Sequence, residues 1–332
     1  MFDQYLPTIF LGLMALSIFI YAILDGYDLG VGILMPMDNE PQRDKMIATI
    51  GPFWDANETW LVLAVGILLI AFPNAHSLVL GHLYLPATFL LIGLIMRGVA
   101  FDFRAKAPTQ YKNRWDRVFK IGSLVVTLMQ GYMLGMYVMG FENTIQSVVF
   151  SLLSAIGVSA AYMLIGSAWL VYKTEGELQQ QAAKWGKFAG YVFIIGMIII
   201  SSTNLYFKED VAQRWLSFTG LMLMLGLLMA SFYMYMTIDY HFKQILENKK
   251  IKNDYSAFLM TIVLYLIVAV GFAFSYFPYV VPGQMLASES ISSIESLRII
   301  FYGVAVVLPL IIAYTLFSYW IFRGKATDLN YD

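Results

Sequence analysis

Nine apolar stretches of about 20 residues follow one another along the chain, and they limit its fold more than any other feature. A helix of that length crosses about 30 Å of hydrocarbon. Backbone groups in lipid must bond within their own segment, and no alternating strand pattern indicates a barrel. We therefore predict an all-α polytopic membrane protein with nine transmembrane helices, near 8–35, 47–72, 78–101, 118–139, 148–172, 188–206, 214–236, 256–279 and 298–322.

The composition agrees with these spans: 59% of the 332 residues are apolar and 13% are charged. Soluble domains typically carry about 25% charged residues, so a cytosolic enzyme, a disordered chain and a disulfide-stapled secreted domain are excluded. A formal net charge of −1 gives no field that attracts nucleic acid. Because the chain contains no cysteine, it has no disulfide, thiolate-ligated haem or iron–sulfur cluster of its own.

The distribution of Lys and Arg predicts the orientation of the spans. Seventeen of these 21 residues follow the first, third, fifth, seventh and ninth stretches, three lie on the opposite side, and Arg97 falls within a span. Positive charge marks the cytoplasmic side, so the N-terminus is expected outside and the C-terminus in the cytoplasm. The leading segment 1–7 has no basic residue, and the run after it is too long for a cleavable signal.

No polar gap is long enough for a soluble domain, so we predict one integral membrane domain over 1–332. Membrane proteins often grow by duplicating bundles. A division into helices one to four, helices five to eight and a leftover ninth helix is therefore possible, although the halves show no clear self-similarity.

Charged residues interrupt the apolar pattern within the first three predicted spans, at 24–32, 51–60 and 96–104. Each buried charge costs about 2.5–3.5 kcal/mol on insertion scales, so several together require compensation or a function. Asp25 comes late in the first span, Asp55 early in the second and Arg97 late in the third. All three are expected in the cytoplasmic half of the membrane.

Spacing adds a second constraint, because residues three apart share a helical face. Asp25 shares a face with Asp28, and Asp55 shares one with Glu58. Four carboxylates near the single Arg97 cannot all ionise cheaply, so the group is a candidate proton path or cation site. The alternative is that Asp28, Glu58 and Arg97 are helix-end residues whose charged groups reach the interface.

Nearby glycines and Trp54 are less specific signals. Gly26, Gly30 and Gly32 permit close helix approach, which would bring Asp25 toward a neighbouring helix. Trp54 is either an interfacial belt residue or a contact for a quinone ring.

The chain has three histidines, His76, His82 and His241. We interpret them as polar loop residues. The less favoured alternative is that His76 or His82 binds a haem.

The sequence blocks around these charges resemble those of subunit II of the cytochrome bd family of quinol oxidases. They are DGYDLGVG at 25–32, PFWDANETWL at 52–61 and RGVAFDFR at 97–104, with further matches KTEGEL at 173–178, FPYVVP at 277–282 and YTLFSYW at 314–320. Two departures stand out. Some members have glycine and glutamine where this chain has Ala56 and Glu58, which resembles the cyanide-insensitive branch, and the tail beyond Lys325, with Tyr331, matches poorly.

The resemblance implies nine helices arranged as two four-helix bundles plus one. It also implies a haem-bearing partner, subunit I, that carries two haems b and one haem d, oxidises quinol at the outer face and reduces dioxygen to water. This chain would bind no haem, and a small single-helix subunit could join the complex. The residues matching Asp25, Asp28, Asp55 and Arg97 are associated with a cytoplasmic proton path and cation binding, and Trp54 with a structural quinone.

We therefore predict a haem-free subunit of a terminal oxidase in the bacterial plasma membrane, which generates proton-motive force with its partner. The alternative is a stand-alone transporter coupled to protons or cations, since midplane carboxylates with glycines also mark transporters. Against it, helices four to nine contribute almost no charge that faces the cluster.

Overall fold

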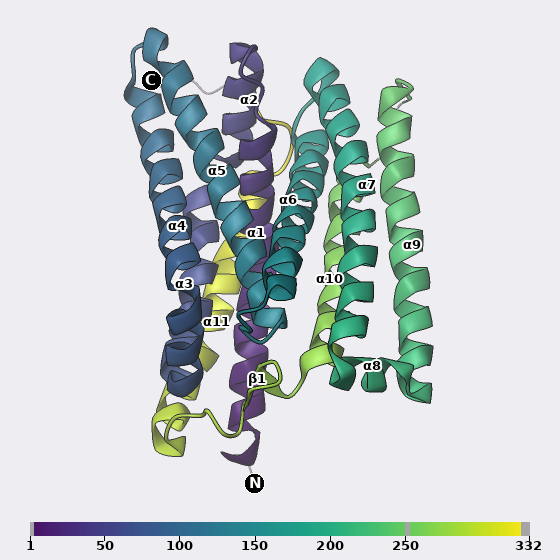
Figure 1. Cartoon of the computed structure of the whole chain (residues 1–332). Coiled ribbons are helices and arrows are strands. Elements are labelled where there is room, and N and C mark those ends of the chain that lie inside the picture. The colour runs from purple at the N-terminus through teal and green to yellow at the C-terminus, as the bar shows by residue number, and fades with distance from the viewer. Residues whose placement is uncertain (1–2, 250–252, 327–332) are drawn as a thin grey trace.

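The computed structural model describes residues 3–249 and 253–326, and nine helices in these ranges are long and apolar enough to cross a membrane. The predicted all-α membrane fold is thus confirmed (Figure 1). The long helices are α1 (Leu6–Leu34), α3 (Trp54–Ala71), α4 (Pro73–Lys106), α5 (Thr109–Val138), α6 (Ile145–Lys173), α7 (Gly176–Phe207), α9 (Phe218–Leu246), α10 (Ser256–Tyr276) and α11 (Ile294–Ile321).

Shorter elements lie between the long helices. A 3₁₀ turn, η1 (Asp3–Tyr5), precedes α1; α2 (Glu40–Ile50) precedes α3; and α8 (Glu209–Leu216) precedes α9. After α10 the chain forms a small antiparallel hairpin of β1 (Tyr279–Val281) and β2 (Met285–Leu286).

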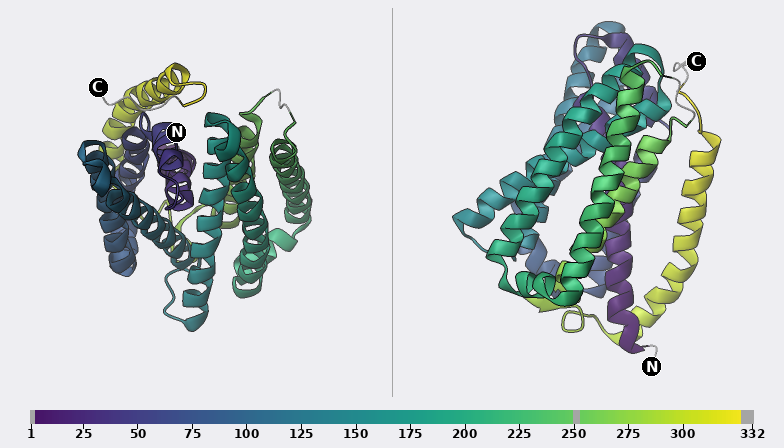
Figure 2. Two further views of the ribbon diagram at one scale, coloured as in Figure 1. Left: turned by 90° about the horizontal axis from the view of Figure 1, so that it is seen from above. Right: turned by 90° about the vertical axis from the view of Figure 1, so that its right-hand side faces the viewer.

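The long helices form two groups that meet along α1, α5 and α6. Helices α1, α3, α4 and α5 form one group and α6, α7, α9 and α10 the other (Figures 1 and 2). Helix α11 lies at the outside of the bundle, and its most apolar window has no buried residue. The largest apolar core is centred on the inner faces of α1, α6 and α10, with fully buried Tyr27, Leu164 and Leu264.

The second predicted stretch, 47–72, is not one helix. It is split into α2 and α3 by a turn at residues 51–53. The cause is local, because Pro52 has no N–H for the helical ladder and its ring clashes with the preceding turn. As a result Asp55 and Glu58 lie in the first turns of a new helix rather than inside a continuous one.

Other helix ends also differ from the predicted ones. The predicted start at 214 falls in the amphipathic α8, and α9 begins at Phe218, where the Ser217 side chain accepts a hydrogen bond from the Gly220 N–H. Helices α4 and α7 extend past the apolar stretches at 78–101 and 188–206 with polar turns, to Lys106 and from Gly176. Hydropathy marks the lipid-facing length of a helix, whereas the hydrogen-bonded ladder continues into water.

Candidate functional site

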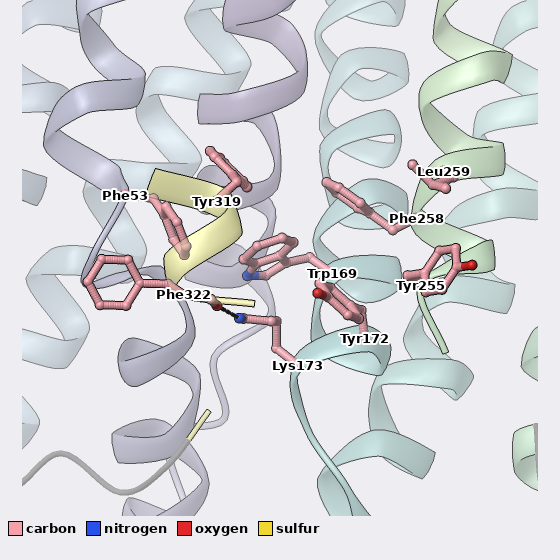
Figure 3. Close-up of a pocket in the computed structure, with 9 residues that line it drawn as sticks. All are labelled: Phe53, Trp169, Tyr172, Lys173, Tyr255, Phe258, Leu259, Tyr319 and Phe322. Atoms are coloured by element: carbon pink, nitrogen blue, oxygen red, sulfur yellow. Dashed lines mark hydrogen bonds between the residues drawn. The ribbon is translucent and has the colours of Figure 1, made fainter. Parts of the chain in front are cut away.

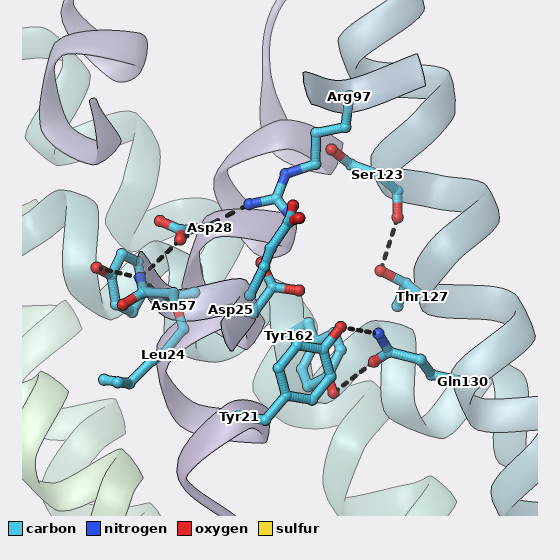
Figure 4. Close-up of polar contacts among 12 residues, drawn as sticks. Tyr21, Leu24, Asp25, Asp28, Asn57, Arg97, Ser123, Thr127, Gln130 and Tyr162 are labelled. Atoms are coloured by element: carbon cyan, nitrogen blue, oxygen red, sulfur yellow. Dashed lines mark hydrogen bonds and ion pairs between the residues drawn. The ribbon is translucent and has the colours of Figure 1, made fainter. Parts of the chain in front are cut away.

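Four charged side chains from three helices meet in one cluster. The Arg97 guanidinium of α4 lies with Nη1 2.5 Å from Asp25 Oδ1 and 3.2 Å from Glu58 Oε1, and with Nη2 3.7 Å from Asp28 Oδ2. Asp25 and Asp28 are one turn apart on α1, and Glu58 comes from α3. Figure 4 shows both aspartates of α1 pointing toward the guanidinium.

Burial separates the two interpretations of these residues. The side chains of Asp25, Asp28 and Arg97 are 0% exposed, whereas that of Glu58 is 25% exposed. A helix-end residue that reaches the interface would expose its charged group. That alternative is therefore wrong for Asp28 and Arg97, and of the four cluster residues in the described structure it is Glu58 that reaches the surface.

The cluster is short of positive charge. Three carboxylates surround one guanidinium, and within the described residues Asp25 Oδ2, Asp28 Oδ1, and Nε and Nη2 of Arg97 are buried with no hydrogen-bond partner. Buried charge is stable only when it is paired and hydrogen-bonded. The arrangement is therefore chemically suited to take up protons, or one cation, between the carboxylates.

Asp55 does not belong to this group. It is exposed and forms no ion pair with Arg97, although it lies one turn before Glu58 on α3. The expectation that four carboxylates lie within reach of Arg97 is thus wrong for Asp55. The turn at Pro52 starts α3 with Asp55 on its outer side, so the two carboxylates of this helix point to different environments.

Close helix contacts at glycines position the cluster. A Cβ at Gly30 would overlap the Tyr162 carbonyl of α6, and one at Gly26 would press on the Tyr162 ring. Between α4 and α5, a Cβ at Gly122 would lie 2.8 Å from the Gly93 carbonyl oxygen and 3.1 Å from the backbone nitrogen of Arg97. Small residues let backbones approach this closely, so the predicted role of Gly26 and Gly30 is confirmed.

A neutral network of three side chains, which sequence reasoning missed, flanks the cluster. Asn57 Nδ2 donates to Asp28 Oδ2 at 2.8 Å and to the Tyr27 hydroxyl at 3.0 Å. The Tyr27 and Tyr319 hydroxyls lie 2.6 Å apart, which links α11 to the site. Asn57 was recognisable as a buried polar residue beside Glu58, but nothing in the sequence pairs Tyr319 with α1.

A second neutral network lies toward the N-terminal end of α1. Gln130 of α5 donates from Nε2 to the Tyr21 hydroxyl at 2.6 Å, and its Oε1 accepts from the Tyr162 hydroxyl at 2.7 Å (Figure 4). Tyr21 stands one turn before Asp25 on α1. Polar groups thus continue from the charged cluster further into the bundle.

A separate charged network, also missed, fixes the turns beyond the cluster. Asp116 of α5 is fully buried and accepts hydrogen bonds from Nε of Arg104 and, at 2.7 Å, from Nε of Arg43. Arg104 also donates to Asp44 at 2.5 Å. Here two guanidiniums match two carboxylates, so the network is paired and ties α2 to α4 and α5.

An aromatic cavity of about 250 Å³ lies where α6, α10 and α11 converge (Figure 3). Its walls include Trp169, Phe258 and Tyr319, and the Lys173 ammonium lies 5.3 Å from the centre of the Trp169 ring and donates to the Phe322 carbonyl at 2.6 Å. Trp54 does not line this cavity. Its ring packs 4.8 Å from that of Phe101.

Comparisons with known proteins cover nearly the whole chain. The family model described as cytochrome bd terminal oxidase subunit II matches residues 6–322. A cytochrome bd ubiquinol oxidase subunit 2 of Bacillus subtilis is 29% identical over 92% of this chain and 93% of its own, and a cytochrome bd-I ubiquinol oxidase subunit 2 of Escherichia coli is 25% identical over 92% and 91%. A solved structure of bd oxidase from Geobacillus thermodenitrificans has the same fold, with a TM-score of 0.77 and 17% identity over 96% of this chain and 98% of that one.

Proposed function

This chain belongs to the family of cytochrome bd terminal oxidase subunit II, and from that premise we propose that it is the haem-free subunit of a quinol:dioxygen oxidoreductase. In this role it stabilises the haem-bearing subunit I and supplies a cytoplasmic proton path or cation site. The observation that carries the proposal is the buried cluster of three carboxylates around Arg97. No observation favours the stand-alone transporter.

The proposed path begins at α3 and ends inside the bundle. Asp55 is the exposed outer carboxylate, and Glu58 is the half-buried next one. Arg97 joins Glu58 to Asp25 and Asp28, which can each hold a proton that a neighbouring carboxylate releases. The positive charge of the guanidinium keeps the carboxylates close together. It also neutralises one carboxylate, so fewer bound protons are needed to make the cluster neutral.

The Tyr21, Gln130 and Tyr162 network would continue this path away from the cytoplasm. Hydroxyl groups can accept and donate a proton, whereas the Gln130 amide orients them. We place the cluster on the cytoplasmic side because the basic residues concentrate there. Proton uptake at that side and quinol oxidation at the outer side would together generate proton-motive force.

We assign the side of α3 that faces away from the bundle as the contact surface for subunit I. Asp55 and Thr59 are exposed on this face together with Val62, which is 71% exposed. Carboxylates within a span face protein or water rather than lipid. Contact with subunit I along α3 would shield Glu58 from lipid and bring the cluster next to the partner's oxygen site.

Two haems b and one haem d, which we assign to subunit I, would carry out the reduction of dioxygen. Quinol is the proposed electron donor of the complex, and Trp54 is the residue of this chain proposed to contact a structural quinone. A small single-helix subunit is a further proposed partner. The multi-pass chain would reside in the bacterial plasma membrane.

The test is a mild-detergent purification through a tag on this chain, followed by a dithionite-reduced minus oxidised visible spectrum. We expect haem bands together with a second large polypeptide. The haem bands should disappear when that polypeptide is removed. A colourless, monodisperse single chain purified from cells that also express subunit I would overturn the proposal.

A further inference from the structure

A hollow of about 550 Å³ lies at the turn that joins α4 to α5, apart from the acidic cluster. Phe103, Trp115 and Val118 form its apolar wall, and Lys106, Tyr111 and Arg114 line it with polar groups. The rings of Phe103 and Trp115 lie 5.3 Å apart, and Phe103 is 56% exposed. The hollow therefore offers an apolar surface beside two cationic side chains.

The basic residues near this turn are of two kinds. Arg43 and Arg104 are paired with Asp116 and Asp44 and are buried. Lys106 and Arg114, by contrast, are exposed and form no ion pair within the described ranges 3–249 and 253–326. Asp44 and Asp116 are thus used by the buried arginines, whereas Lys106 and Arg114 carry positive charge beside the hollow with no ion pair among the described residues.

Arg114 is held in place without losing its hydrogen-bonding capacity. Its guanidinium carbon lies 5.2 Å from the centre of the Tyr111 ring. A cation over an aromatic face leaves the N–H edges of the guanidinium free to donate. An oxyanion at the hollow could therefore accept from Arg114 in a bidentate manner while Lys106 supplies a second charge.

The position of the hollow defines which anion fits. The predicted apolar stretches end at residue 101 in α4 and begin at 118 in α5, so Phe103 and Val118 place the hollow at the expected boundary between hydrocarbon and water. A soluble anion would leave the Phe103 and Trp115 rings uncovered. A zwitterionic lipid would place the positive amine of its own headgroup near Lys106 and Arg114. An anionic phospholipid matches both the charge and the apolar wall.

We propose that this hollow is a binding site for an anionic phospholipid of the cytoplasmic leaflet. Lys106 and Arg114 bind the headgroup phosphate, and the glycerol and first acyl carbons lie against Phe103, Trp115 and Val118. This site goes beyond the oxidase function and does not depend on it, because it uses no residue of the acidic cluster.

The experiment is native mass spectrometry of the complex, purified through a tag on this chain, delipidated, and titrated with phosphatidylglycerol or phosphatidylcholine of equal acyl chains. The wild type should retain phosphatidylglycerol preferentially. Lys106→Gln and Arg114→Gln should each weaken retention about fivefold, the effect of one basic residue near an anionic lipid. Arg323→Gln is the matched control, because this arginine also lies over a ring, that of Trp320 at 5.0 Å, but outside the hollow.

Three outcomes would overturn the site: equal retention of the two lipids, equal losses in the Arg323→Gln control, or displacement of phosphatidylglycerol by millimolar inorganic phosphate. The last result would identify a soluble anion as the ligand. Loss of phosphatidylglycerol retention in Trp115→Ser, with both basic residues intact, would support the apolar half of the site. The yield of complex, measured for every variant, separates loss of the lipid from loss of assembly. Because Lys106 is exposed, Lys106→Gln should leave the yield unchanged.

Discussion

Arg97 of α4 binds Asp25 of α1 through a contact of 2.5 Å in which neither side chain is exposed. The two residues are 72 positions apart, so the pair fixes two helices that do not follow one another in the chain. A buried pair of this kind is costly to break, because removal of one partner strands the other charge. The pair therefore links the stability of the helix group to the chemistry of its carboxylates.

Asp25→Asn should slow quinol-driven oxygen consumption by about tenfold or more, because an amide cannot carry the proton that a carboxylate transfers. Haem content should remain unchanged, since an amide oxygen can still accept from Arg97. The measurement is oxygen uptake per haem in purified complex. Asp44→Asn, which changes the half-exposed partner of Arg104, is the control and should retain turnover. Turnover of Asp25→Asn equal to that of the control would exclude the proton-path role. The variant Asp55→Asn should slow oxygen consumption less than Asp25→Asn does, because Asp55 is exposed.

Arg97→Leu should lower the yield of assembled complex, because it leaves Asp25 and Asp28 buried without their cation. The loss of stability should be about 3–5 kcal/mol. The double variant Arg97→Leu with Asp25→Asn should recover part of the yield, since it removes both partners of the closest pair. The readout is complex recovered per cell, followed by size-exclusion chromatography. Normal yield of the single variant would show that the cluster does not need the guanidinium.

Gly30→Ala should destabilise the contact of α1 with α6, because the added Cβ would overlap the Tyr162 carbonyl. Overpacking of a close contact costs about 1–3 kcal/mol. The melting temperature of the purified complex should fall, and activity should fall with it as Asp25 moves away from Arg97. Gly12→Ala on the same helix is the matched control, because nothing lies within 4 Å of a Cβ there. Equal melting temperatures for the two variants would contradict the contact.

Tyr319→Phe should loosen α11, since the hydroxyl that lies 2.6 Å from the Tyr27 hydroxyl is removed. One lost hydrogen bond corresponds to about 1 kcal/mol. Limited tryptic cleavage after α11, at Arg323 and Lys325, should become faster because Tyr319 lies at this end of the helix. Tyr314→Phe serves as the comparison, because Tyr314 is on the same helix and 65% exposed. Identical cleavage rates in the two variants would argue against a role for the hydroxyl.

The sequence was sufficient to predict the membrane class, nine membrane-crossing stretches and the four residues of the charged cluster, to which it wrongly added Asp55. Hydropathy and the helical period are local properties, and both are read over a few turns. The spacing of Asp25 and Asp28 already places them on one face, and the charge cost of burying them already indicates a function. The glycines of α1 also indicate close helix contact by their spacing alone.

Contacts between helices could not be predicted in the same way, because they depend on the rotation and depth of each helix. The exposure of Asp55, the match of Asp116 with two arginines and the contact of Tyr319 with Tyr27 are all of this kind. A difference of one residue in where α3 begins turns a side chain by about 100°, since a helix has 3.6 residues per turn. The sequence thus determined which charges enter the membrane, and the packing of α1, α3, α4 and α6 decided which of them meet.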